Sequence, residues 1–236
     1  MTTFCLVPDA GGGFDGTAEE VDHVFTNHIL KEGQAKAGYL DAVRLFDATV
    51  GDYVLVSFWE SEEDAMATHD EKYYFASQQQ LWKYSRFNMF KTEHFNVATV
   101  HPDNGGPLAV SSFASLTTIT LRNPDDIAEV DDYFHSNIVA HSKRHPGFIG
   151  AQRFLGLTGQ QQHPDQQTCV LATYWESAAH LRAATVGSDF EMFVEKIGTF
   201  AKPGTVETTR QYKGQQFQLP RVPLISRIFT EGSMRA

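Results

Sequence analysis

Apolar residues recur at every fourth position in two segments of the chain, one in each half. The positions are Val21, Phe25 and Ile29 in the first half and Val130, Phe134 and Ile138 in the second. This period places the apolar side chains on one face of an α-helix, so each segment is predicted to be a helix with one buried face. Runs of β-branched and aromatic residues follow each helix and predict strands.

The two halves also match position by position, which indicates an internal repeat. A shift of 109 residues superimposes Val21, Asp22, Phe25, Ile29, Gly38, Ala42 and Arg44 on Val130, Asp131, Phe134, Ile138, Gly147, Ala151 and Arg153. A shift of 116 residues then superimposes Phe58-Trp59-Glu60-Ser61 on Tyr174-Trp175-Glu176-Ser177. The two shifts differ by seven residues, which fall in the polar stretch 156–167, where an insertion in a hairpin loop has little cost.

Each copy is predicted to have the order β-α-β-β-α-β. The first strands are expected near 2–8 and 112–121, the second helices near 62–84 and 178–200, and the last strands near 89–99 and 206–212. Gly38 and Gly147 end the first helices, and Ser61 and Ser177 are suited to cap the second ones. The expected fold class is α+β, with two tandem ferredoxin-like units that form a fused dimeric α/β barrel.

The predicted boundaries follow the turn residues. Residues 1–100 are expected to form the first ferredoxin-like domain, 101–109 a linker rich in Gly and Pro, 110–213 the second domain, and 214–236 a C-terminal tail. Arg44 and Arg153 alternate with apolar strand residues, and we expect them to face the interface between the copies as an ion pair.

Composition narrows the function classes. The 236 residues are 42% hydrophobic and carry a net charge of −10 without a basic run, which argues against nucleic acid as a partner. No stretch approaches the length of a membrane span, and we expect a cytoplasmic protein without membrane association. Cys5 and Cys169 are expected to be buried thiols, and the histidines lack metal-ligand spacing, so no metal site is predicted.

The strand that ends in Trp59-Glu60-Ser61 or Trp175-Glu176-Ser177, after a strand that begins Gly38-Tyr39-Leu40 or Gly147-Phe148-Ile149, resembles the antibiotic biosynthesis monooxygenase superfamily. The resemblance covers about residues 1–100 and 110–212. It implies the dimeric α/β barrel fold. Members of the superfamily include cofactor-independent oxygenases that oxidise anthrones and related phenolic polyketides, haem-degrading enzymes and proteins of other activities, so the fold transfers better than the function.

The family's functional side chains are only partly present. Where anthrone-oxidising members have Asn and Tyr around the Trp, this chain has Leu55 and Ala65, or Leu171 and Leu181 in the second copy. Where haem-degrading members have an iron-binding His four residues after a Phe, the chain has Gln79 after Phe75 and Val194 after Phe190. We therefore expect no cofactor, and haem binding would require a different ligand, such as His69 or His141.

A cofactor-free oxygenase requires a base that titrates near neutrality, and histidine suits this role. The predicted catalytic residues are His28, His69 and Trp59 in the first copy, which we favour as the copy that holds the site. The predicted substrate-binding residues are Asn27, Phe75, Trp82, Asn137, His141 and Trp175. Asn137 and His141 are four residues apart on the predicted helix and are expected to share a face. The alternatives are that the histidines are solvated surface residues and that Trp59 and Trp175 are packing anchors.

Several functions remain open at this stage. The first is a cofactor-independent, monooxygenase-like oxidoreductase that uses dioxygen on a phenolic or polycyclic aromatic natural-product intermediate. The others are a non-oxidative cyclase or isomerase on the same barrel, a haem-binding protein, and a non-catalytic small-molecule binder. The fused pseudo-dimer is also a candidate for homodimer formation.

Overall fold

The computed structural model describes residues 2–67, 76, 79–86, 91–92, 95–101, 113–156 and 167–216. The first unit contains β1 (Thr2–Cys5), α1 (Asp15–Val24), the π-helix η1 (Phe25–Leu30), α2 (Lys31–Gly33), β2 (Tyr39–Asp47), β3 (Asp52–Trp59), α3 (Glu62–Ala67), β4 (Lys91–Thr92) and β5 (Phe95–His101). The second contains β6 (Phe113–Thr120), η3 (Pro124–Asp126), α5 (Ile127–Tyr133), the π-helix η4 (Phe134–Val139), α6 (Ala140–Ser142), β7 (Phe148–Gly156), β8 (Thr168–Trp175), α7 (Ala178–Ala184), α8 (Ser188–Phe200) and β9 (Glu207–Gln216).

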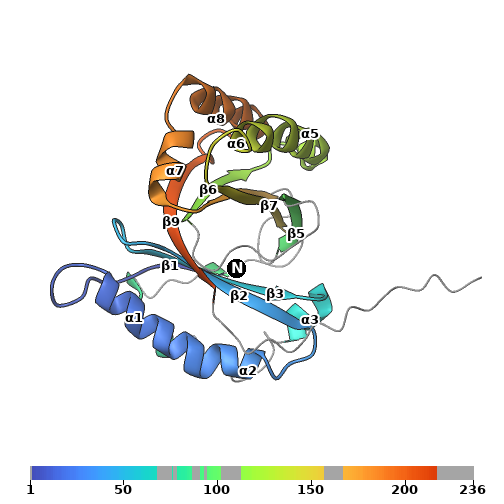
Figure 1. Ribbon diagram of the computed structural model, residues 1–236. Coiled ribbons are helices and arrows are strands. Elements are labelled where there is room, and N and C mark those ends of the chain that lie inside the picture. Colours follow the sequence, from blue (N-terminus) through green and yellow to red (C-terminus); the bar gives the residue numbers. More distant parts are fainter. Residues whose placement is uncertain are drawn as a thin grey trace, which may run out of the picture.

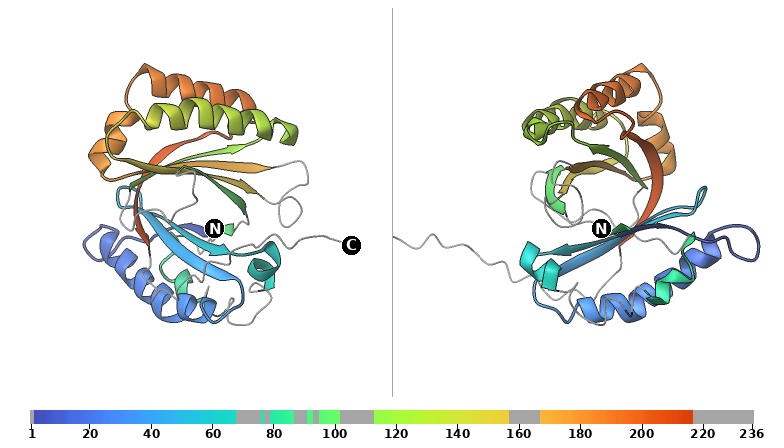
Figure 2. Two further views of the ribbon diagram at one scale, coloured as in Figure 1. Left: turned by 45° about the vertical axis from the view of Figure 1, so that its right-hand side comes forward. Right: turned by 180° about the vertical axis from the view of Figure 1, so that it is seen from behind.

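The described strands form one antiparallel sheet with the order β4-β1-β3-β2-β9-β6-β8-β7-β5. The two edge strands, β4 and β5, are close together in the chain, so the sheet curves round into a barrel. The helices lie on the outer side of both halves of the sheet, α1 and α2 on one side of the molecule and α5 to α8 on the other (Figures 1 and 2). The predicted α+β fold class, two ferredoxin-like units in a fused dimeric α/β barrel, is confirmed.

Each unit contributes its last strand to the other unit. β5 pairs with β7, from Phe95 opposite Gly156 to His101 opposite Ala151. β9 pairs with β6 and then continues to β2, where Lys213 lies opposite Phe46 and Gln216 opposite Val43. Both of these strands end later than predicted, because each reaches across to the other unit: β5 extends to His101 and β9 to Gln216. β9 is therefore longer than the predicted strand 206–212, whereas β5 is shorter than the predicted strand 89–99.

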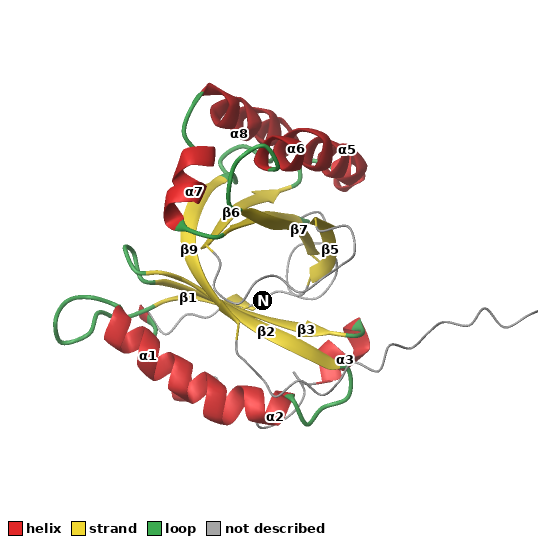
Figure 3. Ribbon diagram, viewed as in Figure 1, coloured by secondary structure: helices red, strands yellow, loops and turns green. Residues whose placement is uncertain are grey.

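The core has three main clusters. One packs α1 and η1 on the first half of the sheet, with Val21 and Phe25 at its centre, and a second does the same around Val130 and Phe134. The third fills the space between the two halves of the sheet, and Phe154 contributes to it. The barrel interior is therefore packed with side chains, and Figure 3 shows the strands between the two helical layers.

The predicted helical faces are nearly right, but both first helices contain a π-helical turn. Leu30 and Val139 are buried, whereas Ile29 and Ile138 are only partly buried. A π-turn takes one more residue per turn than an α-turn, so the inward direction moves by one position within η1 and η4. Such turns are frequent at functional sites.

The second helix of the second unit is broken where one helix was predicted. α7 ends at Ala184 and α8 begins at Ser188, and Gly187 between them has a φ of 120°. Few residues other than glycine adopt this conformation, so Gly187 allows the change of direction between the two helices. The corresponding predicted helix of the first unit begins as α3, and its residues 68–75 and 77–78 lie outside the described residues.

Both shared arginines face the outer helices, which corrects the expectation that they face the interface between the units. Arg44 of β2 binds Asp22 of α1, and Arg153 of β7 binds Asp131 of α5 at 2.9 Å. Tyr53 also donates a hydrogen bond to Asp22. The ion pair therefore connects helix to sheet within each unit.

Candidate functional site

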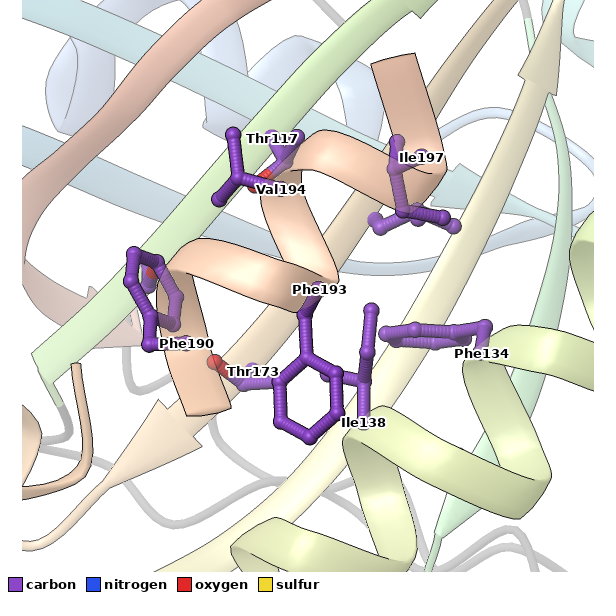
Figure 4. A pocket seen from close by; sticks show the side chains of 10 residues that line it. Thr117, Phe134, Ile138, Thr173, Phe190, Phe193, Val194 and Ile197 are labelled. Carbon is purple, nitrogen blue, oxygen red and sulfur yellow. The ribbon is translucent and has the colours of Figure 1, made fainter. Parts of the chain in front are cut away.

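A pocket lies in the second unit between the outer face of the sheet and the helices η4 and α8 (Figure 4). Its empty volume is about 380 Å³, part of which is open solvent. It is lined by Ser115, Thr117, Phe134, Ile138, Leu171, Thr173, Phe190, Phe193, Val194 and Ile197. The elements of the predicted β-α-β-β-α-β order thus create the pocket where the two helices meet over β6 and β8.

Hydroxyl groups mark the sheet side of the pocket. Ser115 and Thr117 come from β6, where alternate residues point to the same face, and Thr173 comes from β8. Ser115 and Thr173 lie directly opposite each other in the β6–β8 ladder, and both are buried. The pocket therefore has a polar patch on an otherwise apolar surface.

The helix side of the pocket is aromatic and aliphatic. Phe190, Phe193, Val194 and Ile197 come from one side of α8, and Phe134 comes from η4 (Figure 4). Phe134 and Ile197 are almost completely buried, whereas Phe190 and Phe193 are partly exposed. Such apolar walls with a few polar groups are typical of small-molecule sites.

The pocket is closed to an aromatic ligand in this conformation. The space between the lining side chains admits roughly two water molecules. A bound ring would therefore require outward rotation of Phe190 or Phe193, whose partial exposure leaves them room to move.

His141 lies next to this pocket and contacts Phe193. The two rings pack edge to face, with their centroids 5.1 Å apart. The Nε2 atoms of His141 and His145 are 2.9 Å apart, so one ring donates a hydrogen bond to the other. The Nδ1 atom of His141 faces Arg144 at 3.4 Å and Asp189 at 3.7 Å. His141 is thus the titratable group that connects α6 with α8 at the edge of the pocket.

Burial lowers the pKa of His141 below its ordinary value of 6.5, and the nearby His145 and Arg144 lower it further, while Asp189 opposes them. The neutral imidazole is therefore favoured near neutral pH. A neutral imidazole can accept a proton, which is the property that a general base requires.

The predicted site residues of the first unit do not gather around a described pocket. Asn27 and His28 are exposed on η1, and Asn27 donates to the carbonyl oxygen of His23 at 2.9 Å. The π-turn directs both outward while Phe25 and Leu30 point to the core. His69 and Phe75, the other predictions in this region, lie outside the described residues.

The remaining first-unit predictions are surface or packing residues. Trp59 is half-buried, packs edge to face on Tyr39 at 5.3 Å and donates from Nε1 to Ser57 Oγ at 3.1 Å. Trp82 is 43% exposed. The described pocket lies in the second unit, and the preference for the first unit stays a prediction, because His69 and Phe75 lie outside the described residues.

In the second unit, none of the predicted residues lines the pocket, although His141 contacts the lining residue Phe193. Asn137 is exposed and donates to the carbonyl oxygen of Tyr133, so it does not share a face with His141 as their spacing predicted. The π-turn of η4 ends between them and rotates one relative to the other. Trp175 is 1% exposed and packs in the core instead of lining the pocket, although its indole contacts a residue that does.

Several pocket residues escaped sequence reasoning. Ser115 and Thr117 alternate with apolar residues in β6, a pattern that ordinary half-buried strands share. Phe190 and Val194 were compared with the haem-binding spacing, and both line the pocket. Val194 has no donor atom for iron.

The described part of the chain holds no cluster of three or more His, Cys, Asp or Glu side chains suited to a metal ion. None of the helices in these residues is long and apolar enough to cross a membrane. Cys5 and Cys169 are free thiols; Cys169 is buried as expected, but Cys5 is exposed and donates to Asp52.

Comparison with solved structures supports the fold. An anthrone oxidase-like protein matches with a TM-score of 0.66 and 10% identity over 92% of this chain and 90% of the other. Two candidate monooxygenases match with TM-scores of 0.55 and 0.53: one from Fusobacterium nucleatum, with 11% identity over 92% and 90% of the two chains, and one from Lactobacillus acidophilus, with 9% over 91% of each. No protein-family profile and no curated protein sequence matches the chain. At these identities the similarity establishes the shared fold.

Proposed function

We propose that the chain is a monooxygenase-like oxidoreductase that acts on a phenolic or polycyclic aromatic molecule in the pocket of the second unit. The observation that carries this proposal is an apolar, phenylalanine-walled pocket with hydroxyl groups on one side and a histidine of lowered pKa against its wall. The fold shared with an anthrone oxidase-like protein is consistent with the same class of activity.

The proposed chemistry needs no cofactor. In an anthrone, the ring methylene would lose two hydrogen atoms and gain one oxygen atom, and the second atom of dioxygen would leave as water, so dioxygen itself takes up the electrons. A base starts the reaction by removing a proton, because the resulting anion is more easily oxidised. His141 is the proposed base, and Val194 at the compared iron-ligand position favours a reaction without haem.

Ligand entry and the position of His141 are coupled in this proposal. Phe193 must move to admit a ring, and the same side chain packs against His141. His141 Nε2 is engaged with His145 in the closed conformation. Displacement of Phe193 would remove its ring contact with His141 as the substrate enters, and rotation of the imidazole away from His145 would precede proton transfer.

The experiment is oxygen uptake with dithranol, a model anthrone, corrected for spontaneous oxidation. We expect turnover by the wild-type protein and a loss of about 100-fold in His141→Gln, the range for removal of a general base. His28→Gln is the matched control, an exposed histidine of the first unit, and should retain activity. A spectrum with and without haemin accompanies the assay. No uptake by the wild type, or loss only in His28→Gln, would overturn the proposal.

A non-catalytic binder is the second candidate, because the proposed base His141 does not line the pocket and contacts only its wall residue Phe193. Such a protein would bind an aromatic molecule, detected by quenching of tryptophan fluorescence, without consuming oxygen. A non-oxidative cyclase or isomerase would instead change the ligand without oxygen uptake, which product analysis by mass spectrometry would detect.

A further inference from the structure

The tryptophan at the end of β8 is one contact away from the pocket. Trp175 donates a hydrogen bond from Nε1 to Thr173 Oγ1 at 3.1 Å, and Thr173 lines the pocket. Trp175 is held in place by burial and by the ring of Phe148, whose centroid is 5.2 Å away. Its indole orientation is therefore fixed by packing.

This hydrogen bond determines what Thr173 can offer to a ligand. An indole N–H is a donor only, so Trp175 occupies an acceptor position of the Thr173 oxygen. The hydroxyl can still donate its own hydrogen, and donation is the role that suits an oxygen atom of a ligand. Trp175 thus biases Thr173 towards acting as a donor in the pocket.

Ser115 supplies a second hydroxyl beside the first. It is the direct cross-strand partner of Thr173, so the two Cβ atoms are about 5 Å apart, and both residues line the pocket. Both are buried, with 5% and 8% exposure, and a ligand oxygen bound there would be shielded from water. Hydrogen bonds in such surroundings discriminate strongly between ligands with and without the polar atom.

We propose that Ser115 and Thr173 form a subsite for one phenolic or keto oxygen of an aromatic ligand, and that Trp175 is its positioning residue. This inference rests on the pocket of the proposed function. A neutral phenol would accept from Thr173 and donate to Ser115, whereas a phenolate or ketone would accept from both. The subsite can therefore bind the oxygen atom of both the protonated and the deprotonated ligand.

The first unit offers an internal control for the proposed role of Trp175. Trp59 Nε1 donates to Ser57 Oγ at 3.1 Å, the same contact between residues two apart on one strand. Ser57 is exposed and does not line the described pocket. Strand geometry alone produces this contact, and only in the second unit does it reach a pocket.

The test compares binding of 2-naphthol with binding of naphthalene, which lacks the oxygen, by fluorescence titration of the full-length protein without a turnover assay. Thr173→Val, which keeps the shape and removes the hydroxyl, should weaken 2-naphthol binding about 5- to 10-fold and leave naphthalene binding unchanged. Thr173→Ser should restore most of the difference. Trp175→Phe should lower only 2-naphthol affinity, by a smaller factor, and Trp59→Phe should change neither.

The outcomes separate this inference from the proposed function. If the wild type binds 2-naphthol and naphthalene with equal affinity, and Thr173→Val does the same, the subsite is overturned but the pocket is supported. If Trp175→Phe weakens both probes equally, Trp175 is only a packing residue and its positioning role is overturned. Selective loss of 2-naphthol binding in a protein that consumes no oxygen would support the subsite and overturn the oxygenase. Failure of both probes to bind would overturn the subsite and its pocket together.

Discussion

The two units have the same local contacts in different surroundings. Each has an Asp–Arg pair between helix and sheet, and each has a Trp whose indole donates to the hydroxyl two residues earlier. The first unit has the more buried ion pair, with Tyr53 beside it, and the half-exposed Trp. The second has the buried Trp and the described pocket. The contribution of a shared contact to stability, and its role, therefore depend on how deeply the contact is buried.

The side chain beside the ion pair also differs between the two units. Tyr53 and Cys169 occupy equivalent strand positions, and burial raises the pKa of both. The Cys169 thiol has a pKa of about 12 and stays protonated. The tyrosine hydroxyl binds Asp22, whose own pKa is raised by burial despite Tyr53 and Arg44. The first unit therefore has a larger buried polar network than the second.

The largest expected difference concerns the tryptophans. Trp175→Ala should lower the free energy of unfolding by about 3–5 kcal/mol, because a completely buried side chain leaves a cavity. Trp59→Ala should cost roughly half as much, since Trp59 is only half-buried. Urea unfolding followed by circular dichroism measures both. Equal losses would show that burial does not distinguish the two positions.

For the ion pairs, the larger loss of stability is expected in the first unit. Asp22→Ala removes a counter-charge from the buried Arg44 and should cost about 3 kcal/mol. Asp131→Ala should cost about 1 kcal/mol, because the Asp131 side chain is 39% exposed and water can solvate what remains. The same urea experiment tests the pair, and a larger loss at Asp131 would contradict the comparison.

A smaller and equal effect is expected at the helix caps. Ser61 Oγ accepts from the Asp64 amide at 3.1 Å, and Ser177 Oγ accepts from the His180 amide at 3.2 Å. Replacement of either serine by Ala should cost about 1 kcal/mol, the usual value for an N-cap. Ser136→Ala, at an exposed site within η4, is a control for the substitution itself. A clear difference between the caps would show that the two strand-helix junctions are not equivalent.

Much of the fold was readable from the sequence, and less of the site. The period of Val21 and Val130 identified the helical faces, and the Trp-Glu-Ser matches located the strand-helix junctions. The π-turns were missed, because no residue type marks the extra residue per turn. The sequence did not predict that β5 pairs with β7 or that β9 pairs with β2, because alternation identifies a strand but not its partner.

The pocket could not be predicted, because its residues are ordinary ones. Thr173 and Phe193 gain their role from a cross-strand register and a helix that passes over it, which are long-range features. His141 was identified by its spacing to Asn137, but its contacts to Phe193 and Asp189 come from α8, about fifty residues later in the chain. Chemistry-bearing residue types are visible in a sequence, whereas their enclosure depends on the fold.

The smallest expected effect is on the pH dependence of stability, and it belongs to the second unit. The pKa of His141 is lowered in the folded state, so below pH of about 6.5 the unfolded chain binds the proton more readily than the folded one. The free energy of unfolding should therefore fall as pH falls from about 6.5 towards the folded pKa, with no contribution above that window. His141→Gln should reduce this loss between pH 7.5 and 5.5, whereas Asn137→Ala, on the same helical segment, should leave it unchanged. If His141→Gln instead increases the loss, the folded protein favours the charged imidazole, and His141 would be unsuited to act as a base near neutral pH.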